Sequence, residues 1–345
     1  MLYVTTRVQS DAFTANRVLT EDRGPMGGFF LPMQMPKFDE KQIRALAEKS
    51  FAANVAEIIN LLFGTELDSW TVEFAIGRYP VKLVPISGRA TVAETWHNPA
   101  WRFERLARGI EKAILQSDNV EQTDWMVIAA RIAVLFGIFG EMIRECSLDP
   151  DSPIDLALTS GNFSGVMAAV YAREWGLPIE NIVVCSNENP AAWNLLHKGE
   201  LRTEGVPVKT ATPECDHVVP TDLERLIFHN LGAYETQRFV EVCSRGANYY
   251  LERYQIDQLR KGIQVSVASN SRMESSISNL HLTSDYIADP YTALCYSGLI
   301  DVRSRTGVVR PALIMSDESP VHCVGLIARC LGMNPADLKR RIDKG

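Results

Sequence analysis

A loop of small residues in the middle of the chain has the composition of an anion-binding site. Its members are Ser160, Gly161, Asn162, Phe163, Ser164 and Gly165. The loop follows an apolar run at residues 154–158 and precedes a helical pattern that reaches Trp175. A turn between a strand and a helix directs unpaired N–H groups and the positive end of the helix dipole toward one point. Glycines let a ligand approach the backbone, so the loop predicts a phosphate site; the alternative is a tight turn without a ligand.

A second group of polar residues lies on one short segment nearer the N-terminus. Its members are His97, Arg102, Glu104 and Arg105. Histidine and a carboxylate can act as an acid–base pair, and arginines can bind an anion. We therefore treat His97, Glu104 and Arg105 as candidate catalytic residues and Arg102 as a candidate substrate-binding residue. The alternative is that these are solvated charges at the start of a helix.

Composition excludes several classes of partner. The chain has 345 residues and a formal net charge of −7, which argues against nucleic acid or an anionic membrane as the main partner. Seven cysteines without paired spacing are typical of reduced thiols in a cytoplasmic protein. The fragments Cys215-x-His217 and His322-Cys323 lack a second pair at zinc-site spacing, so we expect no metal. The longest apolar run, residues 126–139, is interrupted by Arg131 and is too short to span a membrane.

The elements needed to position these residues can be predicted from periodicity. Residues 39–63 are predicted to be helical with a break near Ser50, and two further helices are predicted at 101–115 and 124–145. Residues 81–86 and 90–96 form paired strands. Residues 154–185 form a strand–helix–strand unit, which implies parallel strands. We predict an α/β protein with an N-terminal helical and β region at 1–100 and an α/β core domain at 101–345.

The segments taken in order resemble threonine synthase, a pyridoxal-phosphate enzyme of fold type II. The matching stretches are residues 3–7, 27–32, 160–165, 176–179, 186–189, 221–226, 289–293 and 319–321. The resemblance implies a parallel sheet flanked by helices, with residues 160–165 holding the cofactor phosphate. It also implies substrate binding by Asn187 and Asn189, and a place for Asp317 opposite the ring nitrogen of the cofactor. A helix N-cap formed by Ser316, Asp317 or Ser319 is the alternative interpretation of Asp317.

Two departures from the family pattern decide the functional prediction. Residues 96–105 match the stretch that carries the family's catalytic lysine, and Glu104 occupies the lysine position. A carboxylate cannot form a Schiff base, and Lys112 lies about 12 Å further along the same helix, too far to replace the lysine. Residues 116–122 alone stand where the family has a small substrate-binding subdomain, so that subdomain is predicted to be largely missing. Trp96, Trp101 and Trp125 flank the gap and can seal it.

Three hypotheses remain for the retained loop. The first is a pseudoenzyme that binds a phosphate ester, or pyridoxal phosphate without covalent linkage, and does not make threonine. The second is an enzyme with a rebuilt site that acts on an amino-acid-like or phosphorylated substrate in a specialised pathway. The third is a regulatory or partner subunit in which the loop is a structural remnant. We expect a cytoplasmic homodimer or heteromeric complex, because faces uncovered by the missing subdomain must pack against something.

Overall fold

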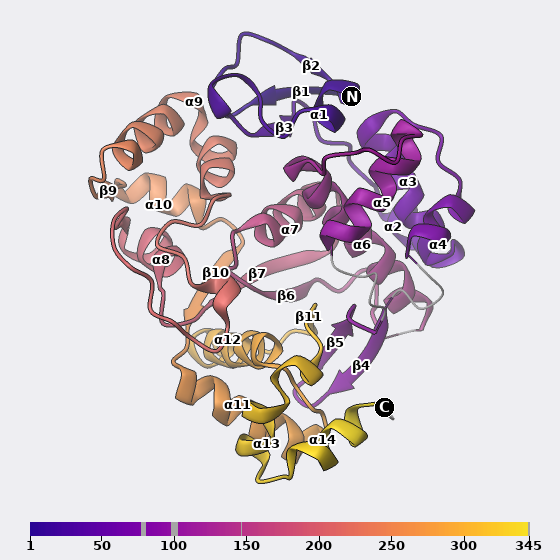
Figure 1. Ribbon diagram of the computed structural model, residues 1–345, viewed down its shortest axis with the longest axis vertical. Coiled ribbons are helices and arrows are strands. Elements are labelled where there is room, and N and C mark those ends of the chain that lie inside the picture. The colour runs from indigo at the N-terminus through magenta and orange to yellow at the C-terminus, as the bar shows by residue number, and fades with distance from the viewer. Residues whose placement is uncertain (77–80, 98–102, 146, 344–345) are drawn as a thin grey trace.

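The computed structural model describes residues 1–76, 81–97, 103–145 and 147–343, and a six-stranded sheet lies at its centre (Figure 1). In spatial order the strands are β10 (Ile263–Val267), β7 (Ile179–Ser186), β6 (Ile154–Thr159), β11 (Ala312–Ser316), β5 (Ala90–Glu94) and β4 (Lys82–Ile86). The strands from β10 to β5 pair in parallel, and β4 pairs antiparallel with β5. Strands such as β6 are buried along nearly their whole length, as expected for a sheet covered on both faces. The α/β class and the mostly parallel core are therefore confirmed.

Helices cover both faces of this sheet and bury two separate apolar cores. One core joins α3 (Phe51–Phe63), α6 (Asp124–Arg144) and α7 (Ser164–Glu174) to strands β6 and β7. The other joins α11 (Asn270–Ser284), α12 (Pro290–Thr306) and α13 (Val324–Leu331) to the opposite face (Figure 1). Both faces of the sheet are thus desolvated, and polar side chains gather instead at the strand ends.

Helix α6 is long and apolar enough to cross a membrane by length and composition. Within the fold, 83% of its apolar window is buried, which is typical of the core helix of a soluble protein. Its single interior charge, Arg131, is half-buried and faces the ends of β6 and β11, where the candidate site lies. The helix is therefore a core element that carries one cation to the sheet edge.

The chain begins with a small antiparallel sheet and continues through short helices before the central sheet starts. The N-terminal sheet contains β2 (Phe13–Thr14), β1 (Leu2–Thr5) and β3 (Phe30–Pro32). The remaining elements are α1 (Ala15–Thr20), η1 (Pro25–Gly27), α2 (Glu40–Ala45), η2 (Leu46–Glu48), α4 (Ser69–Ile76), α5 (Phe103–Leu115), α8 (Ala191–Trp193), η3 (Asn194–Lys198), β8 (Glu200–Leu201), η4 (Pro213–Cys215), α9 (Leu223–Ser244), β9 (Tyr249–Tyr250), α10 (Arg253–Leu259), η5 (Pro320–Cys323) and α14 (Pro335–Ile342). Because β4 and β5 precede residue 100, the central sheet takes strands from both sides of the predicted boundary at residues 100 and 101.

Helices α5 and α6 are joined by a short connection at residues 116–123. The carboxylate of Glu111 on α5 holds this connection, since its Oε1 atom accepts hydrogen bonds from the Thr123 N–H at 3.1 Å and the Thr123 hydroxyl at 2.7 Å. In the part of the chain that the structure describes, the small sheets contain two or three strands, and no second α/β layer is present. The loss of a substrate-binding subdomain stays a prediction.

The tryptophans predicted to seal the gap have different surroundings. Trp125 is completely buried and packs edge-on against Tyr3 and Tyr171. Trp96 stacks on His97 with ring centroids 3.9 Å apart. Trp101 lies outside the described residues. Trp125 therefore fills the core beside the α5–α6 connection, as a sealing residue should.

Candidate functional site

The loop between β6 and α7 has the backbone geometry of an anion cradle. Gly161 and Phe163 both have positive φ angles, 41° and 76°, which turn the chain sharply before the helix. The Asn162 Oδ1 atom accepts a hydrogen bond from the Ser164 N–H at 3.0 Å. The next N–H groups, those of Gly165 and Val166, have no intrahelical acceptor because they belong to the first turn. These two groups are free to bind an anion at the positive end of the helix dipole.

An arginine that the sequence analysis did not assign to the site lies beside this first turn. A Cβ atom placed on Gly165 would lie 3.7 Å from Nη1 of Arg131, so the guanidinium borders the helix N-terminus. The same nitrogen lies 3.4 Å from Oδ2 of Asp317. The available signal was the interruption of an apolar helix by a single charge. A guanidinium next to unpaired N–H groups is the usual composition of a phosphate site.

A cavity of about 860 Å³ opens in front of the loop. It lies at the carboxyl ends of β6 and β11, where the strand order reverses and α/β proteins commonly bind ligands. Its charged and histidine lining residues are Asp22, Arg23, Glu104, Arg105, Asp124, Arg131, Glu214, His217, Asp317 and Glu318. Loop residues Ser160, Gly161, Asn162, Ser164 and Gly165 also line it. Phe163, by contrast, is completely buried beneath the loop, so it contributes backbone geometry and core packing.

Only part of the predicted catalytic segment reaches this cavity. Glu104 and Arg105 line it. Among the described residues that line the cavity, His97 is absent, and its Nε2 atom instead lies 2.6 Å from Oε2 of buried Glu94 at the end of β5. Arg102 lies outside the described residues. The predicted grouping of His97 with Glu104 is therefore corrected: the histidine is drawn toward Glu94.

Asp317 lies on the cavity wall, and its interpretation as a helix cap is wrong. The cap of η5 is Ser319, whose hydroxyl accepts a hydrogen bond from the Val321 N–H. Asp317 instead accepts a hydrogen bond from the Thr95 hydroxyl at 3.0 Å and faces Arg131. Its carboxylate is thereby fixed at the end of β11, in the same cavity as the phosphate loop. This position is compatible with the predicted cofactor-binding role.

Asn187 and Asn189 are placed away from the cavity lining and hold a neighbouring loop in position. The Asn187 Nδ2 atom donates to Oδ1 of Asp216 at 2.7 Å, and that of Asn189 donates to the same oxygen at 2.9 Å. The segment they anchor carries Glu214 and His217, which do line the cavity. Among described residues, the two asparagines thus position the site indirectly, and their predicted direct contact with substrate stays a prediction.

Glu214 is the second residue that the sequence analysis missed. Desolvation of its carboxyl raises its pKa, and the nearby charges of Glu318, Glu104 and Asp317 raise it further, while Arg131 opposes them. Four carboxylates therefore lie near enough to interact electrostatically. Nothing in the sequence around Glu214 indicates this, because the four residues come from four separate segments.

Buried ion pairs fix the part of the cavity lining that contains Asp22, Arg23 and Asp124. Arg225 is completely buried, and its Nη2 atom lies 2.6 Å from Oδ2 of Asp124. Its Nη1 atom also pairs with Asp222. Arg23 lies 3.2 Å from Asp22 and 3.8 Å from Asp124. The charges of this wall are thus largely compensated within the protein.

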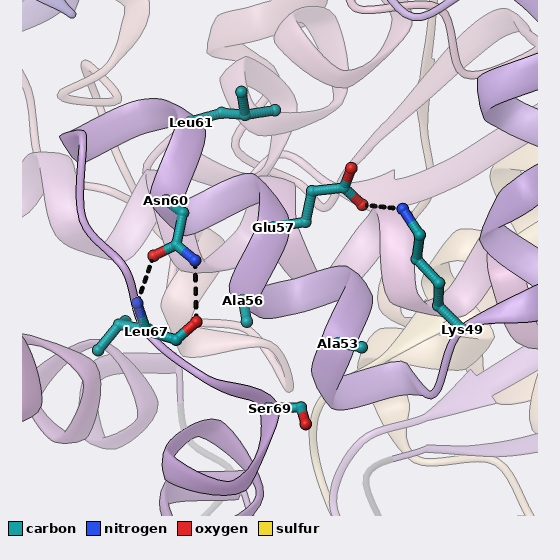
Figure 2. A pocket seen from close by; sticks show the side chains of 8 residues that line it. All are labelled: Lys49, Ala53, Ala56, Glu57, Asn60, Leu61, Leu67 and Ser69. Carbon is teal, nitrogen blue, oxygen red and sulfur yellow. Dashed lines mark hydrogen bonds and ion pairs between the residues drawn. The ribbon is translucent and has the colours of Figure 1, made fainter.

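A second hollow, of about 500 Å³, lies on α3 and carries no comparable chemistry (Figure 2). Its polar residues bond to one another or to the backbone: Lys49 pairs with Glu57 at 2.6 Å, and Asn60 bonds to both backbone groups of Leu67. Within the described ranges, no group of three or more His, Cys, Asp or Glu side chains has the geometry of a metal site. The cavity before α7 is therefore the candidate functional site.

Sequence comparisons relate the chain to threonine synthases and threonine synthase-like proteins. The family model "Threonine synthase N terminus" matches residues 2–78. The human "Threonine synthase-like 1" is 25% identical over 186 residues, which cover 52% of this chain and 24% of the relative. The threonine synthase of Saccharomyces cerevisiae is 23% identical over 191 residues, covering 51% of this chain and 36% of that protein. The matched region is thus well under half the length of either relative.

Solved structures extend the similarity over almost the whole chain. The PLP-bound threonine synthase from Brucella melitensis superposes with a TM-score of 0.85 at 17% identity, covering 99% of this chain and 94% of that one. The yeast threonine synthase gives a TM-score of 0.80 at 15% identity, covering 99% and 94%. At these identities the structural matches establish the fold, which is that of fold type II enzymes.

Proposed function

We propose that this chain, a divergent threonine-synthase-like protein, binds a phosphate ester of the pyridoxal-phosphate class in the cavity before α7 without covalent attachment. The observation that carries the proposal is the guanidinium of Arg131 beside the free N–H groups of the first turn of α7. A phosphate at this point would receive charge-assisted hydrogen bonds and the helix dipole together. A ligand bound in this way is held mainly by its phosphate.

The residues of the cavity suit the phosphate and the ring nitrogen of pyridoxal phosphate, but they do not suit covalent attachment of its aldehyde. The loop and Arg131 suit its phosphate, and Asp317 supplies a carboxylate in the same cavity for a protonated ring nitrogen. The position expected to hold the lysine is Glu104, whose carboxylate cannot link to the aldehyde. When bound, the cofactor supplies an electron-withdrawing ring. Glu104 and Glu214 would accept protons from, or donate hydrogen bonds to, groups near that ring according to pH.

This proposal replaces threonine synthesis as the expected activity. A lysine at the base of the cofactor both fixes it and moves protons in enzymes of this kind, and the matching position here holds a carboxylate. Among the described residues the cavity lining includes no lysine. We therefore expect no conversion of phosphohomoserine to threonine by this chain.

A rebuilt enzymatic site is the second candidate function. It is favoured over an inert remnant by the carboxylates and arginines that line a cavity beside Asn162. Such a site would act on an amino-acid-like or phosphorylated substrate, with Glu104 or Glu214 as the acid–base group. Cytoplasmic location and assembly into a homodimer or heteromeric complex are further parts of the proposal.

The proposed function is tested with two ligands that differ by one phosphate. Calorimetric titration with pyridoxine 5′-phosphate, which has no reactive aldehyde, should give saturable binding, and titration with pyridoxine should give binding at least about tenfold weaker. Equal binding of the two compounds, or binding of neither, would contradict a phosphate-dependent site.

A further inference from the structure

Among the described residues, four carboxylates that line the cavity interact with only a few cations. The carboxylates of Glu104, Glu214, Asp317 and Glu318 come together there from different segments. The interaction among these groups is visible at Glu214, whose pKa is raised by burial and then by Glu318, Glu104 and Asp317. Like charges held together in a partly desolvated space repel, unless a cation lies between them.

The described cations that line the cavity are fewer than its carboxylates. The arginines on the cavity lining are Arg23, Arg105 and Arg131, against six lining carboxylates. Arg23 pairs with Asp22 and Asp124, and Arg225 also contributes its charge to Asp124. Arg131 lies between the helix N-terminus and Asp317. His322 bonds to Glu318 from outside the cavity lining. Within the described part of the chain, Arg105 and Arg131 are thus the lining arginines left to face these four carboxylates.

The missing positive charge is better supplied by an ammonium group than by a metal ion. A divalent cation needs three or more ligands at short and well-defined distances. No described group of His, Cys, Asp and Glu side chains has that geometry. An ammonium group tolerates a looser arrangement, because it has three donors and can share them among separated carboxylates. The cavity is also large enough for a ring between its two charged ends.

We propose that the occupant is a phosphate ester that also carries an ammonium group, with its phosphate at the first turn of α7 and its ammonium at Glu104 and Glu214. The probe of this chemistry is pyridoxamine 5′-phosphate, the amine form of the cofactor class. This proposal rests on the proposed function for the position of the phosphate. It also gives Glu104 a role: the carboxylate at the lysine position selects the amine form of the ligand in place of the aldehyde.

The test uses two ligands that share the ring and the phosphate and differ at one substituent. Pyridoxamine 5′-phosphate carries an ammonium group, and pyridoxine 5′-phosphate carries a neutral hydroxymethyl group at the same carbon. Calorimetric titration of the full chain at neutral pH should give a dissociation constant about tenfold lower for the amine. Glu104→Gln and Glu214→Gln should each reduce that ratio, with little change for pyridoxine 5′-phosphate. The exposed pair Glu274–Arg329 provides a control, since Glu274→Gln should leave the ratio unchanged.

The outcomes separate this inference from the function on which it rests. Equal affinities for the two phosphate esters, or an amine preference that survives both cavity substitutions, would overturn the inference while leaving the phosphate site intact. Failure of both esters to bind would overturn the proposed function itself. Thermal unfolding without ligand checks that each variant is folded. If one variant does not fold, the other still tests the ratio.

Discussion

Arg131 is the residue on which the phosphate site depends most. It is the interior charge of an otherwise apolar core helix, and its guanidinium lies beside Gly165 at the start of α7. A charge carried into a core is costly unless it is paired, and here Asp317 supplies part of that pairing at 3.4 Å. The proposed phosphate site uses this cation at the point where the first turn of α7 begins.

Replacing Arg131 should weaken every phosphate ligand by a similar factor. We expect Arg131→Gln to raise the dissociation constants of pyridoxine and pyridoxamine 5′-phosphate by about tenfold or more, because a charge-assisted hydrogen bond is lost. Calorimetry measures both constants. Arg329→Gln, which removes an exposed arginine from its pair with Glu274, is the matched control. A loss confined to one of the two ligands would argue against contact between Arg131 and the phosphate.

The preference for the amine should depend on pH in a predictable direction. Burial and neighbouring carboxylates raise the pKa of Glu214, so this group gains a proton sooner than an ordinary glutamate as the pH falls. The groups that face it are Glu104, Glu318, Asp317 and Arg131. Bound ammonium favours the ionised carboxylates, so the affinity ratio of amine to alcohol should decrease as the pH falls through the pKa of Glu214. Taking the ratio cancels protonation of the phosphate, and a ratio independent of pH would contradict the prediction.

At the scale of elements, the α5–α6 connection is held in place by a buried carboxylate. Glu111 is buried, and its carboxylate holds Thr123 through two hydrogen bonds. Desolvation raises the pKa of Glu111 to about 6. This buried carboxylate fixes the start of α6, the helix that carries Arg131.

The raised pKa of Glu111 predicts the sign of a stability change with pH. The folded state binds the proton of the Glu111 carboxyl more tightly than the unfolded state does. Its contribution to the free energy of unfolding is therefore fully present below the usual glutamate pKa and is lost as the pH rises through about 6. As the pH rises across that interval, the free energy of unfolding of the native chain should therefore fall relative to that of the Glu111→Gln variant. Urea unfolding at a series of pH values measures it, with Glu40→Gln on the surface as the control. Parallel curves for native chain and variant would contradict the assignment.

Elements with strong local patterns were predictable, and those defined by tertiary packing were not. The strand–loop–helix at residues 154–175 and the helix break near Ser50 follow from apolar periodicity and capping, and the structure confirms both. Helix α12 escaped prediction because it is buried around much of its circumference and has little amphipathic pattern. Strand β10 is short and follows a polar stretch, so its sequence alone gives a weak signal.

The same distinction applies to the candidate site. The loop at residues 160–165 and Glu104 could be found from sequence as parts of the cavity, because a local motif and a substituted motif position mark them. Glu214 could not, since it reaches the cavity through a loop held by Asn187 and Asn189. His97 was predicted to act together with Glu104, and the structure shows its ring nitrogen bonded to Glu94, a contact that sequence spacing did not indicate. Convergence of distant segments is the part of a site that one sequence does not display.

At the scale of the whole molecule, buried charges join the N-terminal sheet and α9 to the core. Arg7 pairs with Glu224 at 2.8 Å, and Arg225 reaches both Asp222 and Asp124. Removing one partner of a buried pair leaves an uncompensated charge, which costs about 3–5 kcal/mol. The cavity wall formed by Asp124 therefore depends on contacts between segments that are remote in the sequence.

Assembly of the molecule is predicted to involve exposed aromatic surface. Trp70 and Phe74 on α4 are 71% and 85% exposed, and their rings stack on each other. If self-association buries this pair, light scattering should give a dimer mass for the native chain and a lower mass for the double variant Trp70→Ser, Phe74→Ser. A dimer unchanged by the double substitution would place the interface elsewhere, and a monomeric native chain would contradict the predicted homodimer.

The central claim is that the cavity holds a phosphate ester without a covalent bond, and one measurement tests it most directly. The native chain is saturated with pyridoxal 5′-phosphate, binding is followed by calorimetry, and the complex is then treated with borohydride and analysed by peptide mass mapping. We predict saturable binding that pyridoxine 5′-phosphate displaces, together with no stoichiometric ligand adduct on any lysine. A stoichiometric adduct on a single lysine, or the absence of displaceable binding, would contradict the account.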